Sequence, residues 1–435
     1  MLLEDETPEW FGTMKILYVS QYFAPEMGAP AARATELTRH WARADHEVTV
    51  LTGFPNHPTG VVPREYRDRF RKMVCREQID GVNVIRTWLL PFPNRKAYER
   101  ILNYSSFCAS AAITGLSLSR PDVVIATSPQ LLVGLSGWWL ARWKRVPFVF
   151  EVRDLWPESL AAVGMGENHS VLYRVLAKIA GFLYRHSDRI VVVTSAFEDY
   201  LVEHWRVPRE KMSVIENGVE TQQFAPVAAT SLRKELGTEE KFAVSYVGTI
   251  GVAHGLETIL RSASQLRDTN PAVVFLLVGE GAEKERMIAM ARERNLHNVR
   301  FINQQFRQKV PAYICASDAC LVLLKKAALF KTVIPSKMLE FMSCARPVIL
   351  GVDGQARTIL DEARCGLAIE PENADALANA IRYLAMNRDA ARELGQNGRQ
   401  YVVRKFSRSQ TAERYIHMLE KLLQLPARDR IEVAA

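Results

Sequence analysis

The stretch KKAALFKTVIPSKMLEFMSCARPVILGVD, residues 325–353, decides the fold of this chain. The runs at 319–324 and 347–351, which bracket its loop and helix, are apolar without alternation, as is typical of strands buried on both faces of a sheet. Pro335 ends the loop, and Ser336 is expected to cap a helix with an apolar stripe. A buried strand, a helix and a second buried strand predict a parallel sheet of the α/β class.

The start of this helix has the features of an anion site. Ser336 and Lys337 would lie above the carboxyl end of a parallel strand, where free N–H groups and the helix dipole attract a phosphate. Lys325 adds positive charge, and Glu340 supplies a carboxylate that can accept two hydrogen bonds from the hydroxyls of a sugar. A phosphate site beside a ribose site predicts a nucleotide, although an ordinary strand–helix unit with a solvated basic loop has the same pattern.

Length and composition limit the classes of protein to consider. The 435 residues are too many for one ordinary core, so two or three domains are expected. A net charge of +8 suits an acidic partner, and we expect a phosphorylated ligand and an anionic membrane surface, not nucleic acid. The 6 cysteines contain no CxxC pair, which argues against a zinc site and fits a reduced cytosolic protein.

We expect a cytoplasmic protein that lies peripherally on the inner face of the cell membrane. The leader at 1–13 is acidic and short, unlike a signal peptide. Residues 123–141 carry no charge, and their length alone would suggest a membrane span. The turn TSPQ at 127–130 instead divides them into a strand and a helix.

The first half of the chain alternates strands with helical patterns, which predicts a doubly wound parallel sheet. Gly28 lies in the loop QYFAPEMGAPAAR after the first strand, and Asn56 and His57 lie in the loop GFPNHPTG. Arg153 and Asp154 stand at the carboxyl end of a strand, where such sheets bind ligands, and they could either pair with each other structurally or face a substrate. The expected strands are 15–20, 46–51, 122–126, 147–152, 189–194 and 212–216.

The second half repeats this organisation, beginning with a strand at 242–247 that runs into the loop GTIGVAHG at 248–255. The next two strands end before Gly279 and Asn303. Each half therefore carries a Gly-rich loop after its first strand. The predicted domains are 14–218, 219–400 and, for a C-terminal helix that packs back on the N-terminal domain, 401–435.

The motifs of several other enzyme classes do not occur in the sequence. It contains no DxD, no P-loop, no HExxH and no GxSxG. Without a carboxylate pair for a metal, a leaving diphosphate must be neutralised by backbone dipoles and by Lys or Arg. This reasoning predicts a sugar-nucleotide transferase that needs neither a metal ion nor another cofactor.

From Met14 to about Leu423 the chain resembles the GT-B glycosyltransferases of family 4. Within them it is most similar to a bacterial subgroup that resembles the L-fucosamine transferases of O-antigen and capsule biosynthesis. The motifs that carry the resemblance are QYFAPEMGAPAAR, LTGFPNHPTG, FEVRDLWPES, VIENGVE, VGTIGVAHGLETIL, IPSKMLEFMSCARPVI and GVDGQA. Each motif is weak alone, but seven in the right order are specific.

The resemblance implies both a fold and a reaction. The fold is GT-B, in which two Rossmann-like domains with doubly wound parallel sheets face each other across a cleft. The reaction is retaining, metal-independent transfer of a sugar, expected to be an N-acetylated deoxyhexosamine, from a UDP-sugar. The implied acceptor is a saccharide linked to undecaprenyl diphosphate, in the biosynthesis of a surface polysaccharide.

Residue roles follow from the resemblance where the motifs match. Glu340 takes the place of the second Glu of the family's E-x7-E motif, the ribose ligand, whereas the first Glu falls on Thr332 and is absent. Ser336 and Lys337, in the subgroup's IPSK motif, then face the diphosphate. Gly28 matches a glycine that lets the backbone approach the diphosphate.

The loop GTIGVAHG departs from the family pattern. Thr249 and His254 stand where wider relatives carry an Arg and a Lys for the diphosphate, and Val252 stands where the subgroup carries another Arg. Lys325 and Lys337 are the expected substitutes for that charge. A His has an ordinary pKa of about 6.5, so we expect a bound diphosphate to raise the pKa of His254 and protonate it.

The expected site residues form three groups. Arg153 falls where many relatives carry a His beside the transferred sugar. The expected catalytic residues are Arg153, Asp154, Lys325 and Lys337. The expected donor-binding residues are Gly28, Gly248, Thr249, His254, Gly279, Asn303, Ser336, Lys337 and Glu340. The expected acceptor-binding residues are Asn56, His57 and Arg153.

Two basic and aromatic patches in the first half could lie on anionic lipid or could simply be solvated. The first patch contains Arg64, Tyr66, Arg67, Arg69, Phe70, Arg71 and Lys72. The second contains Arg95, Lys96, Tyr98 and Arg100.

Two other functions fit the same architecture. One is a non-catalytic GT-B scaffold, which the missing Glu and Arg favour and the intact IPSK motif opposes. The other is a sugar-nucleotide epimerase of GT-B fold.

Overall fold

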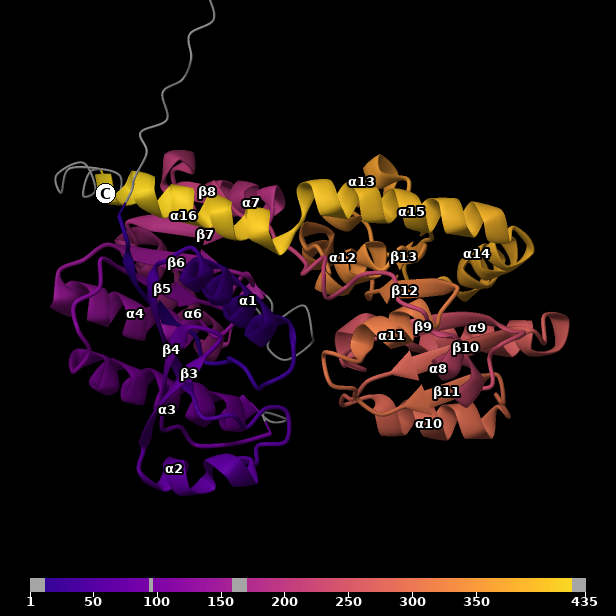
Figure 1. Cartoon of the computed structure of the whole chain (residues 1–435), viewed down its shortest axis with the longest axis horizontal. Coiled ribbons are helices and arrows are strands. Elements are labelled where there is room, and N and C mark those ends of the chain that lie inside the picture. The colour runs from indigo at the N-terminus through magenta and orange to yellow at the C-terminus, as the bar shows by residue number, and fades with distance from the viewer. Residues whose placement is uncertain (1–11, 94–96, 159–169, 425–435) are drawn as a thin grey trace, which may run out of the picture.

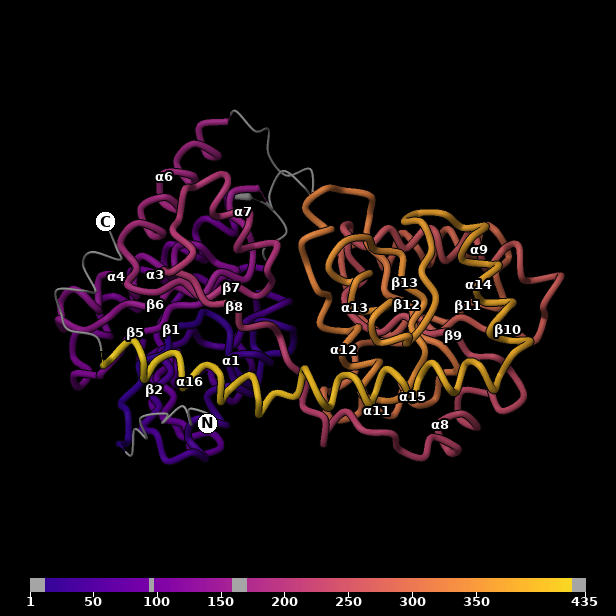
Figure 2. The backbone as a smooth tube through the Cα atoms, turned by 90° about the horizontal axis from the view of Figure 1, so that it is seen from above, coloured from indigo at the N-terminus to yellow at the C-terminus, as the bar shows by residue number. Residues whose placement is uncertain are grey.

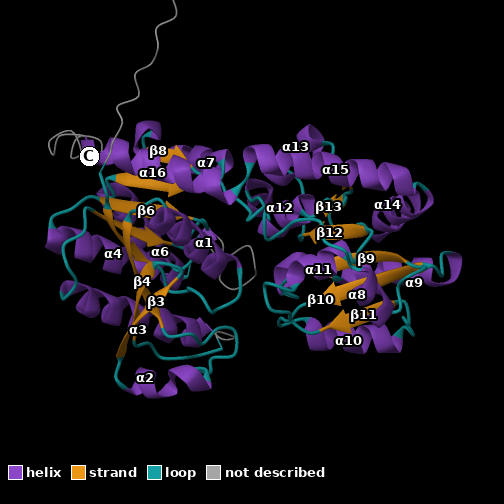
Figure 3. Cartoon of the chain, viewed as in Figure 1, coloured by secondary structure: helices purple, strands orange, loops and turns teal. Residues whose placement is uncertain are grey.

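The structure is a computed structural model that describes residues 12–93, 97–158 and 170–424. Two α/β domains lie side by side, and Figure 1 shows the N-terminal domain on the left and the C-terminal domain on the right. Helices surround the strands of both domains in Figure 3, and each sheet has a hydrophobic cluster on both faces. The predicted architecture of two α/β domains with parallel sheets is confirmed.

The N-terminal sheet has eight strands in the order β3-β4-β2-β1-β5-β6-β7-β8. These strands are β1 (Lys15–Val19), β2 (Glu47–Gly53), β3 (Val74–Ile79), β4 (Val82–Thr87), β5 (Val123–Thr127), β6 (Phe148–Val152), β7 (Arg189–Val192) and β8 (Met212–Val214). The helices around them are α1 (Ala29–Arg43), α2 (Arg67–Arg71), α3 (Ala97–Leu116), α4 (Leu131–Lys144), α6 (Val171–His186) and α7 (Ser195–Trp205).

The C-terminal sheet has six strands in the order β11-β10-β9-β12-β13-β14. These strands are β9 (Phe242–Val247), β10 (Val273–Val278), β11 (Val299–Ile302), β12 (Ala319–Leu323), β13 (Val348–Gly351) and β14 (Gly366–Ala368). The helices are α8 (Thr230–Glu235), α9 (Glu257–Thr269), α10 (Lys284–Glu293), α11 (Val310–Cys315), α12 (Ser336–Ser343), α13 (Gln355–Ala363), α14 (Ala374–Met386), α15 (Arg388–Lys405) and α16 (Arg408–Gln424).

The central strands are buried on both faces, as their unbroken apolar runs predict. Every residue of β9, β10 and β12 is buried, and the strand neighbours in this sheet are all parallel. The N-terminal sheet differs at its edge, where β3 pairs antiparallel with β4. The sequence reasoning missed this hairpin, which turns at Asp80 and Gly81, both with positive φ angles.

The last helix returns to the first domain. In Figure 2 α15 and α16, both yellow, follow one another from the C-terminal domain to the N-terminal domain. α16 packs against α1, where the ring centroids of Trp41 and Tyr415 lie 5.0 Å apart. Trp41 Nε1 also donates a hydrogen bond of 3.2 Å to the carbonyl of Ala412. α16 therefore completes the core of the N-terminal domain.

The uncharged run at 123–141 does not form one helix. Its first part is β5, and the chain then turns before α4 begins at Leu131. Across the described residues, no helix has both the length and the apolar character needed to cross a membrane.

Candidate active site

The helix that the sequence marks as an anion site is α12, which follows β12 and precedes β13 in the C-terminal domain. The helix begins at Ser336, and Pro335 occupies the N-cap position without a side-chain hydrogen bond. The expectation that Ser336 caps the helix is therefore wrong. Because a proline has no side-chain acceptor, the side chain at the cap does not satisfy the first N–H groups of the helix.

Lys337 extends from the first turn of α12 toward the end of β9. Its Nζ donates a hydrogen bond of 2.6 Å to the hydroxyl of Tyr246 and lies 4.0 Å from the centroid of that ring. A Cβ atom on Gly248, whose φ is 143°, would lie only 3.0 Å from this Nζ. Gly248 therefore leaves room for the ammonium group beside the loop.

The surroundings of Lys337 shift the pKa of its ammonium group. Burial lowers the pKa of Lys337 to about 7, and the carboxylate of Glu340 opposes this shift. Lys337 thus loses its proton near neutral pH in the free protein. An anion bound beside it would restore the charge.

Gly279 and Asn303 both contact other parts of the C-terminal domain. A Cβ atom on Gly279 would lie 1.9 Å from the carbonyl oxygen of Gly248, so this glycine lets two loops pack together. Asn303 Oδ1 accepts a hydrogen bond of 2.9 Å from Lys284 Nζ. Gly279 therefore supports the loop at 248–255, and Asn303 is held by the first residue of α10.

His254 belongs to a short 3-10 helix, Val252–His254, in the glycine loop. Its ring lies edge-on to Tyr246, with 5.8 Å between the centroids, and its Nδ1 lies 3.3 Å from the carbonyl oxygen of Gly251. Burial, together with the nearby charge of Lys337, lowers the pKa of His254 to about 3. His254 is therefore neutral in the free protein, far from the ordinary pKa that the sequence reasoning assumed.

Thr249 belongs to this loop, and Lys325 contacts it from the segment after β12. Thr249 has an exposed side chain, and its carbonyl oxygen accepts a hydrogen bond of 2.7 Å from the hydroxyl of Tyr246. The backbone N–H of Lys325 donates to the carbonyl of Ala253 at 2.9 Å, and its side chain is exposed. Both residues lie at the loop, with Lys325 at its solvent side.

Glu340 lies one turn after Lys337 and is not a free carboxylate. Its Oε1 accepts a hydrogen bond of 2.9 Å from Arg307, which lies in the segment between β11 and α11. Arg307 was not expected, because one arginine in a polar loop gives no signal in a sequence. The structure places it between the predicted ribose ligand and the N-terminal domain.

In the N-terminal domain Gly28 and Arg153 come together at the start of α1, and Asp154 follows Arg153 in the chain. Gly28 occupies the N-cap position of α1 with a φ of 137°. The guanidinium of Arg153 donates to the carbonyls of Ala29 and Pro30, at 3.2 and 3.4 Å. Burial raises the pKa of Asp154 to about 6, and Arg153 opposes the shift.

Asn56 and His57 are held by a carboxylate that the sequence reasoning did not select. Their backbone N–H groups both donate to Glu26 Oε1, each at 2.9 Å. Burial raises the pKa of Glu26 to about 7. The side chain of Asn56 donates to the carbonyl of Phe54 at 2.9 Å, whereas His57 is exposed and lies edge-on to the ring of Tyr22.

Three of the sequence motifs meet in one buried network. Arg33, on α1, donates to Glu151 Oε1 at 2.7 and 2.9 Å and to Asn217 Oδ1 at 3.1 Å. The other oxygen of Glu151 accepts from the hydroxyls of Tyr18 and Thr127, at 2.9 and 2.5 Å. These groups join α1, β6 and the end of the first domain. Arg33, Glu151 and Asn217, which belong to the motifs but had no predicted role, therefore have a structural role.

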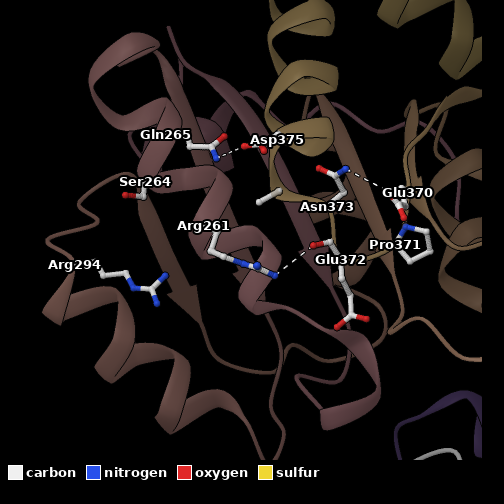
Figure 4. Close-up of a pocket in the computed structure, with 10 residues that line it drawn as sticks. Arg261, Ser264, Gln265, Arg294, Glu370, Pro371, Glu372, Asn373 and Asp375 are labelled. Atoms are coloured by element: carbon white, nitrogen blue, oxygen red, sulfur yellow. Dashed lines mark hydrogen bonds between the residues drawn. The ribbon is translucent and has the colours of Figure 1, made fainter.

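Two pockets lie on the C-terminal domain. One has a volume of about 190 Å³ and includes Gly251, Gly255 and Lys325, so it reaches the glycine loop. The larger one, of about 810 Å³, lies between α9 and the segment at 370–375 (Figure 4). Arginine and carboxylate side chains line it, and it contains none of the predicted site residues. The smaller pocket is therefore the one beside the expected donor site.

Two family models match the chain, one in each domain. Residues 28–218 match the Glycosyl transferase 4-like domain, and residues 229–401 match Glycosyl transferases group 1. WcaI of Escherichia coli (strain K12), named as a colanic acid biosynthesis glycosyl transferase, is 26% identical in an alignment 412 residues long that covers 90% of this chain and 98% of WcaI.

Solved structures show the same fold. Sucrose-phosphate synthase from Thermosynechococcus elongatus has a TM-score of 0.73 at 22% identity, covering 94% of this chain and 98% of that one. Anabaena HepE in complex with UDP-glucose has a TM-score of 0.70 at 16% identity, covering 94% of this chain and 100% of HepE. With a Glycosyl transferase 4-like domain followed by a group 1 domain, the chain belongs to the glycosyltransferases of the GT-B fold.

Proposed function

We propose that this glycosyltransferase moves a sugar from a UDP-sugar to a saccharide linked to undecaprenyl diphosphate, with retention of configuration and without a metal ion. The sugar proposed is an N-acetylated deoxyhexosamine, and the product a bacterial surface polysaccharide such as O-antigen or capsule. The observation that carries the proposal is the pair formed by the Lys337 ammonium and the Glu340 carboxylate, one turn apart at the start of α12. WcaI is named for colanic acid biosynthesis, which supports a polysaccharide product, and HepE was solved in complex with UDP-glucose, which supports a UDP-sugar donor.

The donor would be held by complementary charge. Its diphosphate meets the Lys337 ammonium and the N–H groups that begin α12, with Gly248 allowing close approach. Its ribose hydroxyls donate to Glu340. As the bond to the sugar breaks, negative charge grows on the diphosphate, and these fixed groups stabilise it in the transition state.

The N-terminal domain would hold the acceptor and the transferred sugar. Gly28 and Arg153 lie together at the start of α1, and Asp154 is the next residue after Arg153. Figure 1 shows α1 on the side of the domain that faces the C-terminal domain. His57 is exposed on a neighbouring loop. Asp154, with a pKa of about 6, is mostly ionised at neutral pH, so its carboxylate would accept hydrogen bonds from sugar hydroxyls.

An anionic membrane surface at the inner face of the cell membrane is the proposed place of action. In the patch at 64–72, Tyr66 and Phe70 pack against Phe54 and do not project, so only the charged side chains could reach lipid. Arg95 and Lys96 of the second patch lie outside the described residues. Large apolar side chains are exposed on α3 and α4 instead, including Ile113 at 71% and Trp143 at 62%.

The decisive experiment is incubation with UDP-sugars, with and without a lipid-linked acceptor. We expect sugar transfer with the acceptor, slow release of UDP without it, and the same rates in EDTA, because the sequence has no DxD pair to hold a metal. Epimerisation of the donor would instead identify an epimerase. No turnover of any UDP-sugar would identify a scaffold, and rescue of an EDTA-treated enzyme by Mg²⁺ or Mn²⁺ would contradict the metal-independent mechanism.

A further inference from the structure

Arg307 joins three parts of the molecule that are far apart in the sequence. Its NH1 donates to Glu340 Oε1 on α12, and its NH2 donates to Glu36 Oε1 on α1, both at 2.9 Å. Its guanidinium also lies 4.8 Å from the ring centroid of Phe224, in the segment between the two domains. Arg307 therefore contacts the donor helix, the acceptor domain and their connection at once.

The contacts form a chain of alternating charges. The second oxygen of Glu36 accepts a hydrogen bond of 2.9 Å from Nε of Arg408, and NH2 of Arg408 forms an ion pair with the same oxygen, also at 2.9 Å. The side chains of Glu36, Glu340 and Arg307 are 5%, 16% and 29% exposed, so solvent screens these pairs only in part. A guanidinium is a planar fork whose N–H groups point in fixed directions, whereas an ammonium group is a point charge with rotatable donors.

We propose that Arg307 is a positioning residue that orients the Glu340 carboxylate for the nucleotide, and that Glu36 of the other domain holds Arg307 in place. The proposal rests on the proposed role of Glu340 as ribose ligand. Arg307 occupies Oε1 of Glu340 and leaves Oε2 for the ribose. Without Glu36, the Arg307 guanidinium is free to rotate and offer a second N–H group to Glu340, where it would compete with the ribose hydroxyls. A residue of the N-terminal domain would therefore set the affinity for the UDP-sugar.

The test measures UDP binding to the full chain by calorimetry. Glu36→Gln should weaken UDP binding about tenfold, the size of one hydrogen bond to a charged group. Glu220→Gln is the matched control, because Glu220 is also partly buried and paired with Arg39 and His40 of α1. Its contacts are with these residues, so UDP affinity should not change.

The second arm asks whether Glu36 acts through Arg307. A lysine lacks the rigid planar fork that fixes both carboxylates in direction, so Arg307→Lys should weaken UDP binding by itself. Adding Glu36→Gln to Arg307→Lys should then cause no further loss. Equal losses from Glu36→Gln in both backgrounds would show that Glu36 acts by another route and would overturn the proposal.

Glu36→Gln leaves Arg408 without its carboxylate, which could impair folding. The double variant Glu36→Gln/Arg408→Gln removes one charge of each sign and should give the same tenfold loss. An unchanged UDP affinity in either variant overturns the coupling alone, provided that Glu340→Ala still weakens binding. If Glu340→Ala also leaves UDP affinity unchanged, the ribose assignment fails, and the coupling fails with it.

Discussion

The two domains each place a Gly-rich loop after their first strand, but the cationic side chains near the two loops have different partners. In the N-terminal domain Arg153 donates to carbonyls of α1 itself, and Arg33 forms a buried ion pair with Glu151. In the C-terminal domain Lys337 packs on the ring of Tyr246 and donates to its hydroxyl, beside Gly248. The first arrangement uses the cations to stabilise the fold, whereas the second leaves an amino group with a pKa of about 7, which a bound anion would protonate.

The largest effect is expected at the ribose ligand in the C-terminal domain. Glu340→Ala should weaken UDP binding by roughly 3–6 kcal/mol, because two hydrogen bonds to a charged acceptor are lost, each worth roughly 1.5–3 kcal/mol. Calorimetry with UDP measures this loss. Glu362→Ala, which removes an exposed carboxylate of the same domain, is the control and should bind UDP normally. Tight binding by the Glu340 variant would show that the ribose lies elsewhere.

In the N-terminal domain the matching variant should change stability instead. Glu151→Gln leaves the buried guanidinium of Arg33 without an anionic partner, which should cost about 3–5 kcal/mol of unfolding free energy. Denaturant unfolding measures it. Asp361→Asn removes an exposed partner of Arg357 and should cost less than about 1 kcal/mol. Similar denaturation midpoints for the two variants would mean that the buried ion pair does not stabilise the fold.

A pH titration separates the two kinds of cation further. The pKa of Lys337 is about 7 in the free protein, and a bound diphosphate should raise it. UDP affinity should therefore be constant below pH 7 and fall as the pH rises through the bound-state pKa, by at most about tenfold per unit. An arginine stays protonated in this range, so Lys337→Arg should show a flatter profile. UDP itself titrates, so the comparison is between variant and wild type. Superimposable profiles would assign the proton uptake to another group.

The smallest effect concerns the proposed membrane surface, which we place on the N-terminal domain. Trp139 and Trp143 stack with 6.3 Å between their centroids on the exposed side of α4. Their replacement by Ser should weaken flotation with anionic vesicles, by about 1 kcal/mol for each partly buried ring. Met386→Ser, at an exposed apolar position of the C-terminal domain, should leave flotation unchanged. Equal losses would mean that the two domains do not differ in lipid contact.

The sequence predicted the regular elements better than the contacts between them. Unbroken apolar runs marked β9, β10 and β12, because a strand buried on both faces needs no alternation. The hairpin of β3 and β4 had a usable signal in Asp80-Gly81, a favoured two-residue turn, which the basic surroundings obscured.

The site residues were chosen by motif, but their partners were not. Tyr246 looked like an ordinary core residue of a strand, yet its hydroxyl lies 2.6 Å from Lys337 Nζ, 91 positions along the chain. Arg307 and Glu36 are 271 positions apart. A pairing over such distances depends on how the domains pack, which local patterns do not encode. The shifted pKa of His254 has the same origin, since the burial that lowers it comes from tertiary structure.

The return of α16 to the first domain has a consequence for synthesis. Trp41 and its neighbours on α1 emerge from the ribosome early, but Tyr415 and Ala412, which cover them, emerge only after the C-terminal domain. Between β9 and α15, by contrast, the C-terminal domain is continuous in the chain and can complete its own core before α16 appears. The domain that is translated first is therefore finished last, and until then it exposes an apolar face to the chaperones that bind such nascent surfaces.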